Sequence, residues 1–230
     1  MSAFVQQKSA AAGGSNNVAA ITFDSNVTAG NCVVAILFWN HATVTLSTIV
    51  DGLGNTYSLI PGSQHVAGVP NNANVSFYKA VSVTGGACTV TATLSGNSDA
   101  FSMQLIELSG SEQDVDNVNI ATGSSSQVTV AITTANSSEP IIAAVVYTGV
   151  DILDVPTGYT RLDTPNITNR CDVHYDVDVG VSGTKNLNCP FTFDTGVWVY
   201  VAASLKSSTP APPAFPPLFK QDRLGAIKKK

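Results

Sequence analysis

Histidines and carboxylates are the side chains that could support catalysis in this chain, and neither type is arranged as a catalytic set. The three histidines are His41, His65 and His174, and no nucleophile, metalloprotease or phosphate-binding motif accompanies them. A catalytic centre needs a nucleophile, a base and a group that orients the base. We therefore expect a protein that is not an enzyme, with no catalytic residue and no cofactor.

The carboxylates form two small groups. Asp172, Asp176 and Asp178 lie at even spacing, so they share one face of a predicted strand, and two of them could approach the spacing of a glycosidase pair. Apolar residues take the alternate positions, which favours a solvent-facing strand instead. Asp114 and Asp116 could cap a loop or touch calcium, but the ligand series of a calcium loop does not follow them. We predict no metal site.

The segment DGLGN (51–55) combines Asp51, two glycines and Asn55, a composition typical of a tight turn between strands. A ligand-binding loop is the alternative interpretation. Tyr57 and Tyr159 occupy matching places in two similar segments, GNTYSLI and TGYTRLD. If the protein binds a glycan, we expect the loop site to comprise Asp51, Asn55, Tyr57 and Tyr159.

The chain contains four cysteines, and one pair of them is a candidate disulfide. Cys32 lies within an apolar run and is predicted to be a buried free thiol. Cys171 and Cys189 would lie on the two arms of one hairpin, about 10 Å apart along the strand, which requires a bulge for bonding. We expect mostly reduced cysteines, with Cys171–Cys189 as the one candidate bridge.

The chain is predicted to be all-β, because short β-branched and aromatic segments alternate with Gly, Asn, Asp and Pro turns. An offset of 97 residues aligns Tyr78 with Tyr175, Phe101 with Trp198 and Met103 with Tyr200, without a gap from 78 to 108. This alignment places His174 at the position of Phe77, and it indicates that Trp198 and Tyr200 are core residues.

We read residues 1–206 as a duplicated β-sandwich with pseudo-repeats of about 15–109 and 125–206, joined by 110–124. Two arrangements stay open: tandem immunoglobulin-like domains, or one jelly-roll-like sandwich that both copies share. The joining segment lacks the Pro, Gly and Ser bias of a flexible spacer, so we favour the single shared sandwich.

Residues 207–230 differ from the rest of the chain. Their Pro-rich part predicts an extended polyproline II arm, which cannot join a central strand. The end of the arm is basic and contains apolar residues. We expect the arm to bind a neighbouring subunit through Phe215, Leu218, Phe219, Arg223, Leu224 and Ile227.

Composition narrows the function classes. Charged residues make up 12% of the chain and the net charge is −5, whereas phosphate binding needs clustered Lys and Arg, so we expect no nucleic-acid partner. The N-terminus shows no secretory signal, and the apolar run from Cys32 to Trp39 is too short to span a bilayer. We therefore expect synthesis in the cytoplasm and no membrane partner.

Five sequence segments resemble those of a known group of proteins: FVQ, TAGNCVVAILFW, DGLGNTYSLI, VSFYKAVSVTGGACTVTATLSG and QLIELSG. Over residues 1–206 the chain resembles β-sandwich proteins of bacteriophage particles and bacterial surfaces. The resemblance implies a jelly-roll-like fold and a virion or surface role, and its motifs are structural.

From these features we predict a non-enzymatic structural protein of a phage virion: a capsid decoration, head-fibre or tail-associated component. Its expected partners are other virion proteins and copies of itself. The alternatives are a carbohydrate-binding or adhesin module for a host surface glycan, or a subunit of an extracellular filament on the bacterial cell surface.

Overall fold

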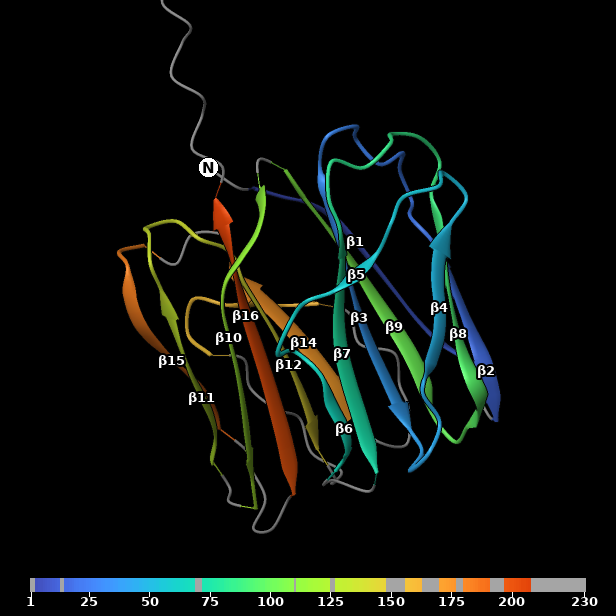
Figure 1. Cartoon of the computed structure of the whole chain (residues 1–230). Coiled ribbons are helices and arrows are strands. Elements are labelled where there is room, and N and C mark those ends of the chain that lie inside the picture. The colour runs from blue at the N-terminus through green and yellow to red at the C-terminus, as the bar shows by residue number, and fades with distance from the viewer. Residues whose placement is uncertain are drawn as a thin grey trace, which may run out of the picture.

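A computed structural model describes residues 3–12, 15–68, 72–109, 111–124, 127–147, 156–162, 170–176, 180–190 and 197–207. Every regular element within these ranges is a β-strand, and the pairings are antiparallel (Figure 1). The prediction of an all-β protein is confirmed.

The first half of the chain forms two sheets. The first inner sheet has the order β1 (Ala3–Ala12), β9 (Phe101–Ser109), β3 (Cys32–Asn40), β7 (Ala73–Ala80) and β5 (Ser58–Leu59), and β6 (His65–Gly68) also pairs with β7. The first outer sheet has the order β2 (Asn16–Thr22), β8 (Thr89–Ser98) and β4 (Leu46–Asp51).

The second half forms the other two sheets. The second inner sheet has the order β10 (Ser111–Gly123), β16 (Trp198–Ser207), β12 (Ile141–Tyr147), β14 (Arg170–Asp176) and β13 (Thr160–Arg161). The second outer sheet consists, within the described ranges, of β11 (Gln127–Thr134) and β15 (Gly183–Pro190).

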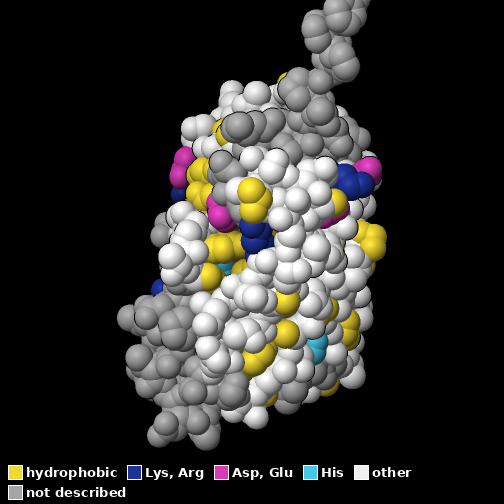
Figure 2. All heavy atoms as spheres, turned by 90° about the vertical axis from the view of Figure 1, so that its left-hand side faces the viewer, with side chains coloured by type: hydrophobic (Ala, Val, Ile, Leu, Met, Phe, Trp, Pro, Cys, Tyr) yellow, Lys and Arg dark blue, Asp and Glu magenta, His cyan; other side chains and the backbone are white. Residues whose placement is uncertain are grey.

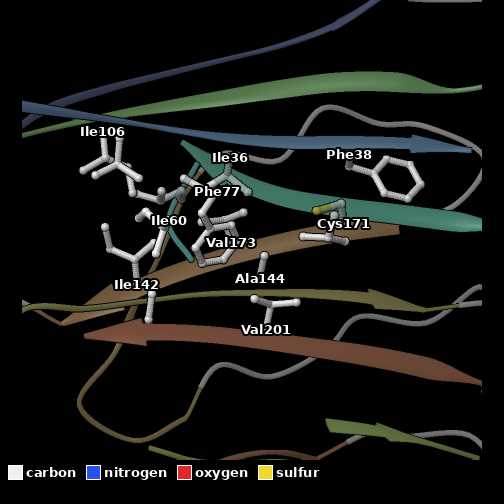
Figure 3. Packing of buried hydrophobic residues seen from close by; sticks show 14 of the residues in the cluster. Ile36, Phe38, Ile60, Phe77, Ile106, Ile142, Ala144, Cys171, Val173 and Val201 are labelled. Carbon is white, nitrogen blue, oxygen red and sulfur yellow. The ribbon is translucent and has the colours of Figure 1, made fainter. Parts of the chain in front are cut away.

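The four sheets stack as four layers, with the two inner sheets face to face and an outer sheet on each far side (Figure 1). Three hydrophobic cores separate the layers. The central core takes residues from both inner sheets, such as Ile36 and Phe77 from one and Ala144 and Val173 from the other (Figure 3). A first outer core and a second outer core fill the remaining two spaces.

Burial on both faces explains why the inner strands are apolar throughout. All seven residues of β12 are buried, whereas buried and exposed residues alternate strictly along β11. A strand buried on both faces cannot place polar residues at every second position, but an outer strand with one solvated face can.

Each sheet draws its strands from only one half of the chain, so the single shared sandwich that we favoured is not what these sheets form. The two halves instead build separate two-layer sandwiches that meet at the central core. The strand order β1-β9-β3-β7-β5 of the first inner sheet matches β10-β16-β12-β14-β13 of the second, position by position.

Candidate functional site

A group of buried polar side chains lies in the second outer core. These residues come from four neighbouring strands of the second inner sheet (β16, β12, β14 and β13), from the connection between β12 and β13, and from β15. We call this group the second-half polar cluster; its members are Tyr147, Tyr159, Arg161, Asp172, His174, Cys189 and Tyr200.

Asp172 is the acidic member of the cluster and is 5% exposed. Its Oδ2 accepts a hydrogen bond of 2.8 Å from the Tyr147 hydroxyl and one of 3.1 Å from Nη2 of Arg161. The Arg161 side chain is 32% exposed to solvent, so the ion pair extends from the core toward the surface at β13. A buried carboxylate without partners would strongly destabilise the fold. The hydrogen bonds from Tyr147 and Arg161 offset this cost for Asp172.

His174 is fully buried, and its Nε2 is hydrogen-bonded to the Tyr200 hydroxyl. Its Nδ1 has no hydrogen-bond partner in the described part of the chain, and the Tyr159 ring stands edge-on to the imidazole at a centroid distance of 5.7 Å. Burial, together with the positive charge of Arg161, lowers the pKa of His174 from 6.5 to about 3. The imidazole is therefore neutral at physiological pH.

Cys189 shares the Tyr200 hydroxyl, at 3.3 Å from its Sγ. Burial raises the pKa of the Cys189 thiol to about 12. A cysteine nucleophile requires a thiolate, usually formed beside a charged imidazole. Because both groups are neutral here, the arrangement is suited to holding uncharged hydrogen-bond partners rather than to nucleophilic catalysis.

The first half has apolar or smaller side chains at several of the corresponding sheet positions. Strand pairing relates Trp39 to Tyr147, because Trp39 pairs with Phe101 and Tyr147 pairs with Trp198. By the same comparison, Leu59 corresponds to Arg161, Ser76 to Asp172, Ala92 to Cys189 and Met103 to Tyr200. The cluster is thus a feature of the second half alone.

The 97-residue offset places His174 one residue out of register. Ile36 pairs with Phe77, and the matching Ala144 pairs with Val173, so Val173 takes the position of Phe77. A shift of one residue exchanges the two faces of a strand. The expectation that Asp172 faces solvent is therefore wrong, because Asp172 and His174 both point into the second outer core; Asp178 lies outside the described residues.

The predicted turn at 51–55 is confirmed, and Asp51 organises it. Oδ1 of Asp51 accepts hydrogen bonds from the backbone N–H groups of Leu53 (2.9 Å) and Asn55 (3.0 Å). Its Oδ2 accepts from Nδ2 of Asn55 (2.8 Å) and the Tyr57 hydroxyl (3.1 Å). Gly54 takes a positive φ of 78°, and the Asp51 pKa is lowered by these hydrogen bonds despite partial burial. Both carboxylate oxygens of Asp51 are therefore used to hold the turn and the adjoining Tyr57 in place.

The four residues proposed as a glycan site do not come together. Asp51, Asn55 and Tyr57 share the turn, and Tyr57 packs against the first outer core. Tyr159 packs against the second outer core, with both inner sheets between the two tyrosines. The hydroxyl of Tyr159 is buried without a hydrogen-bond partner in the described ranges.

The candidate Cys171–Cys189 disulfide does not form: both cysteines are free thiols, in line with the expectation of mostly reduced cysteines. The two residues do not share a hairpin: β14 belongs to the second inner sheet and β15 to the second outer sheet. Cys171 faces the central core and Cys189 the second outer core. Cys32 is a buried free thiol, as predicted. Trp198 and Tyr200 are core residues, as predicted, at 5% and 0% exposure.

The remaining carboxylate candidates, Asp114 and Asp116, have separate partners. Asp114 lies 3.9 Å from the Lys206 ammonium, and Asp116 accepts a hydrogen bond of 2.8 Å from the Ala135 N–H. Within the described ranges, no group of three or more His, Cys, Asp or Glu side chains could hold a metal ion, and no helix could cross a membrane. The predicted arm contacts, Phe215, Leu218, Phe219, Arg223, Leu224 and Ile227, lie outside the described residues.

Comparison with known proteins adds no relative: no family model, no curated protein and no solved structure matches the chain. The family resemblance noted from the sequence therefore stays a prediction.

Proposed function

We propose that this protein is a non-enzymatic structural component of a bacteriophage virion, anchored to its neighbours by residues 207–230. Capsid decoration, head-fibre and tail-associated positions all fit this role. The duplication of a jelly-roll-like or immunoglobulin-like sandwich unit is part of the proposal, and the matching strand order of the two inner sheets supports it.

The observation that carries the proposal is the place where the chain leaves the body. Ala3 pairs with Ser109 at one end of the first inner sheet, and Ser111 pairs with Ser207 at one end of the second. The start of β1, the crossing between the halves and the last residue of β16 therefore lie at one end of the molecule, at the top of Figure 1. An arm that starts there can contact a neighbour while the opposite end stays free.

The surface and the interior support a structural role in different ways. The side of β11 and β15 exposes mostly uncharged polar atoms, with only scattered charged side chains (Figure 2). The central core joins both halves into one packed body. On the other face of the first inner sheet, the buried Glu107 accepts hydrogen bonds from Gln6, Thr28 and Asn31 and so anchors loops and strands to each other.

The test is incorporation into particles. Full-length protein and a variant ending at Ser207 are produced during infection, and particles are separated from free protein on a density gradient. We expect the full-length chain in the particle fraction and the folded truncated chain among the free proteins. Full-length protein that never sediments with particles would refute the virion role, and normal incorporation of the truncated chain would refute the anchoring role of the arm.

A further inference from the structure

Among the residues that the structure describes, the second outer sheet has one strand fewer than the first outer sheet. In the first half, β8 lies between β2 and β4, so both of its edges are paired. In the second half, β15 corresponds to β8 and β11 to β2, but no described strand pairs with the other edge of β15. We call this edge of β15 the open edge.

The connections that follow the corresponding inner strands also differ in length. Seventeen residues separate Trp39 from Tyr57 in the first half, and they include the six residues of β4. Only eleven residues separate the corresponding Tyr147 and Tyr159. The connection in the second half is therefore shorter by the full length of β4.

Side chains from β10 show which backbone groups face the open edge. Nδ2 of Asn119 donates to the Ala131 carbonyl at 2.7 Å, and Nδ2 of Asn117 donates to the Thr133 carbonyl at 3.1 Å. These carbonyls point away from β15, toward β10. In antiparallel pairing, the residues opposite them also turn their N–H and C=O groups outward.

The residues opposite Ala131 and Thr133 are Asn186 and Thr184, and alternation adds Asn188. Their backbone groups therefore face the open edge. The first half supports this assignment: Thr89, which corresponds to Asn186, accepts a 3.3 Å hydrogen bond from the Gly52 N–H at the end of β4. Asparagines of β10 cover the edge of β11, so the row of backbone donors and acceptors without a described partner strand belongs to β15. Such a row is a template for an added strand.

Charge indicates what binds there. Residues 1–207 contain six Lys and Arg against fifteen Asp and Glu, a net charge of −9. Residues 208–230 contain five Lys and Arg against one Asp, a net charge of +4. The C-terminal segment and the body therefore attract each other electrostatically.

Position and reach favour a segment from another copy. The Leu205 N–H donates to the Pro140 carbonyl and the Ser138 N–H donates to the Gly180 carbonyl, so β16 ends at the end of the body where β15 begins. The Pro-rich residues 208–217 are predicted to be stiff and about 30 Å long at roughly 3.1 Å per residue. A spacer of this kind directs the following residues away from their own body.

We propose that the open edge of β15 binds residues 218–230 of a second copy of this chain as an added β-strand. This inference rests on the proposed anchoring role of the arm and names its receptor. The bound segment contains no proline, which agrees with its pairing in a sheet.

The experiment measures binding of a fluorescent peptide of residues 208–230 to the body that ends at Ser207, by fluorescence anisotropy. Asn186→Pro removes an outward N–H without removing a hydrogen bond to β11, and Asn186→Thr keeps that N–H as the matched control. We expect Asn186→Pro to weaken binding at least about tenfold and Asn186→Thr to change it less than about threefold. Raising the salt concentration should weaken binding to the unaltered body.

Two further measurements keep the test decisive if Asn186→Pro does not fold. Hydrogen exchange should show protection of the Thr184, Asn186 and Asn188 amides when the peptide is added. Sedimentation should show concentration-dependent association of the full chain and a monomeric truncated body. No peptide binding, binding without protection of these amides, or a monomeric full chain with protected amides would overturn the inference. Self-association through β15 without incorporation into particles would instead refute only the virion role.

Discussion

The buried neutral imidazole of His174 should make the protein less stable in mild acid. The folded state holds the pKa of this group at about 3, against 6.5 for an unperturbed histidine. Below pH 6.5 the unfolded chain binds a proton that the folded chain does not bind, so the free energy of unfolding falls as the pH falls. The loss continues until the pH approaches about 3, where the folded state is protonated as well.

The size of the effect follows from the proton linkage. Each pH unit well between the two pKa values costs about 1.4 kcal/mol, so lowering the pH from 7.0 to 4.5 should cost about 2.5 kcal/mol through His174 alone. A His174→Gln variant keeps an amide that can bond to the Tyr200 hydroxyl but does not titrate.

The assay is urea denaturation at pH 7.0 and 4.5. Carboxylates also titrate in this range, so the quantity of interest is the difference between the unaltered protein and His174→Gln. We expect the unaltered protein to lose about 2.5 kcal/mol more than the variant. His41→Gln is the control, since His41 lies in a loop where its Nδ1 accepts from the Thr43 and Val44 N–H groups, and it should keep the full loss. Equal losses in the unaltered protein and His174→Gln would refute the reasoning.

Three further predictions concern packing and thiols. Glu107→Gln should lower the free energy of unfolding, measured in urea, by about 2–3 kcal/mol. Both oxygens of the buried Glu107 carboxylate accept hydrogen bonds, and in glutamine one of these oxygens becomes an NH₂ group that faces a donor. An unchanged urea midpoint would contradict this. Gly123→Ala should destabilise the protein by about 1–3 kcal/mol and alter tryptophan fluorescence, since the new Cβ would clash with the indole ring of Trp198; an unaltered spectrum and melting temperature would count against the packing described. Cys171 and Cys189 should react with a thiol reagent only after unfolding, and an intact mass 2 Da lower without reductant would show a disulfide instead.

Some candidate residues were predictable because their roles depend on local sequence. The turn at 51–55 was predicted because Asp51, Gly54 and Asn55 interact within a few residues of each other. Core positions such as Trp198 were predicted by comparing the two halves. The second-half polar cluster was missed because its members come from distant segments, and a one-residue change of offset in β14 reversed the face assigned to His174.

The strand class, the places of many strands and the charge contrast between the body and its C-terminal segment could be read from the residues. These features depend on residue type, on short-range alternation and on composition. The stacking of the two halves as separate sandwiches in four layers became known from the folded arrangement of the strands. An apolar run such as β12 indicates burial on both faces but does not identify the sheets that cover it. The open edge of β15 is likewise a property of pairing between strands, and pairing is decided by neighbours far away in the chain.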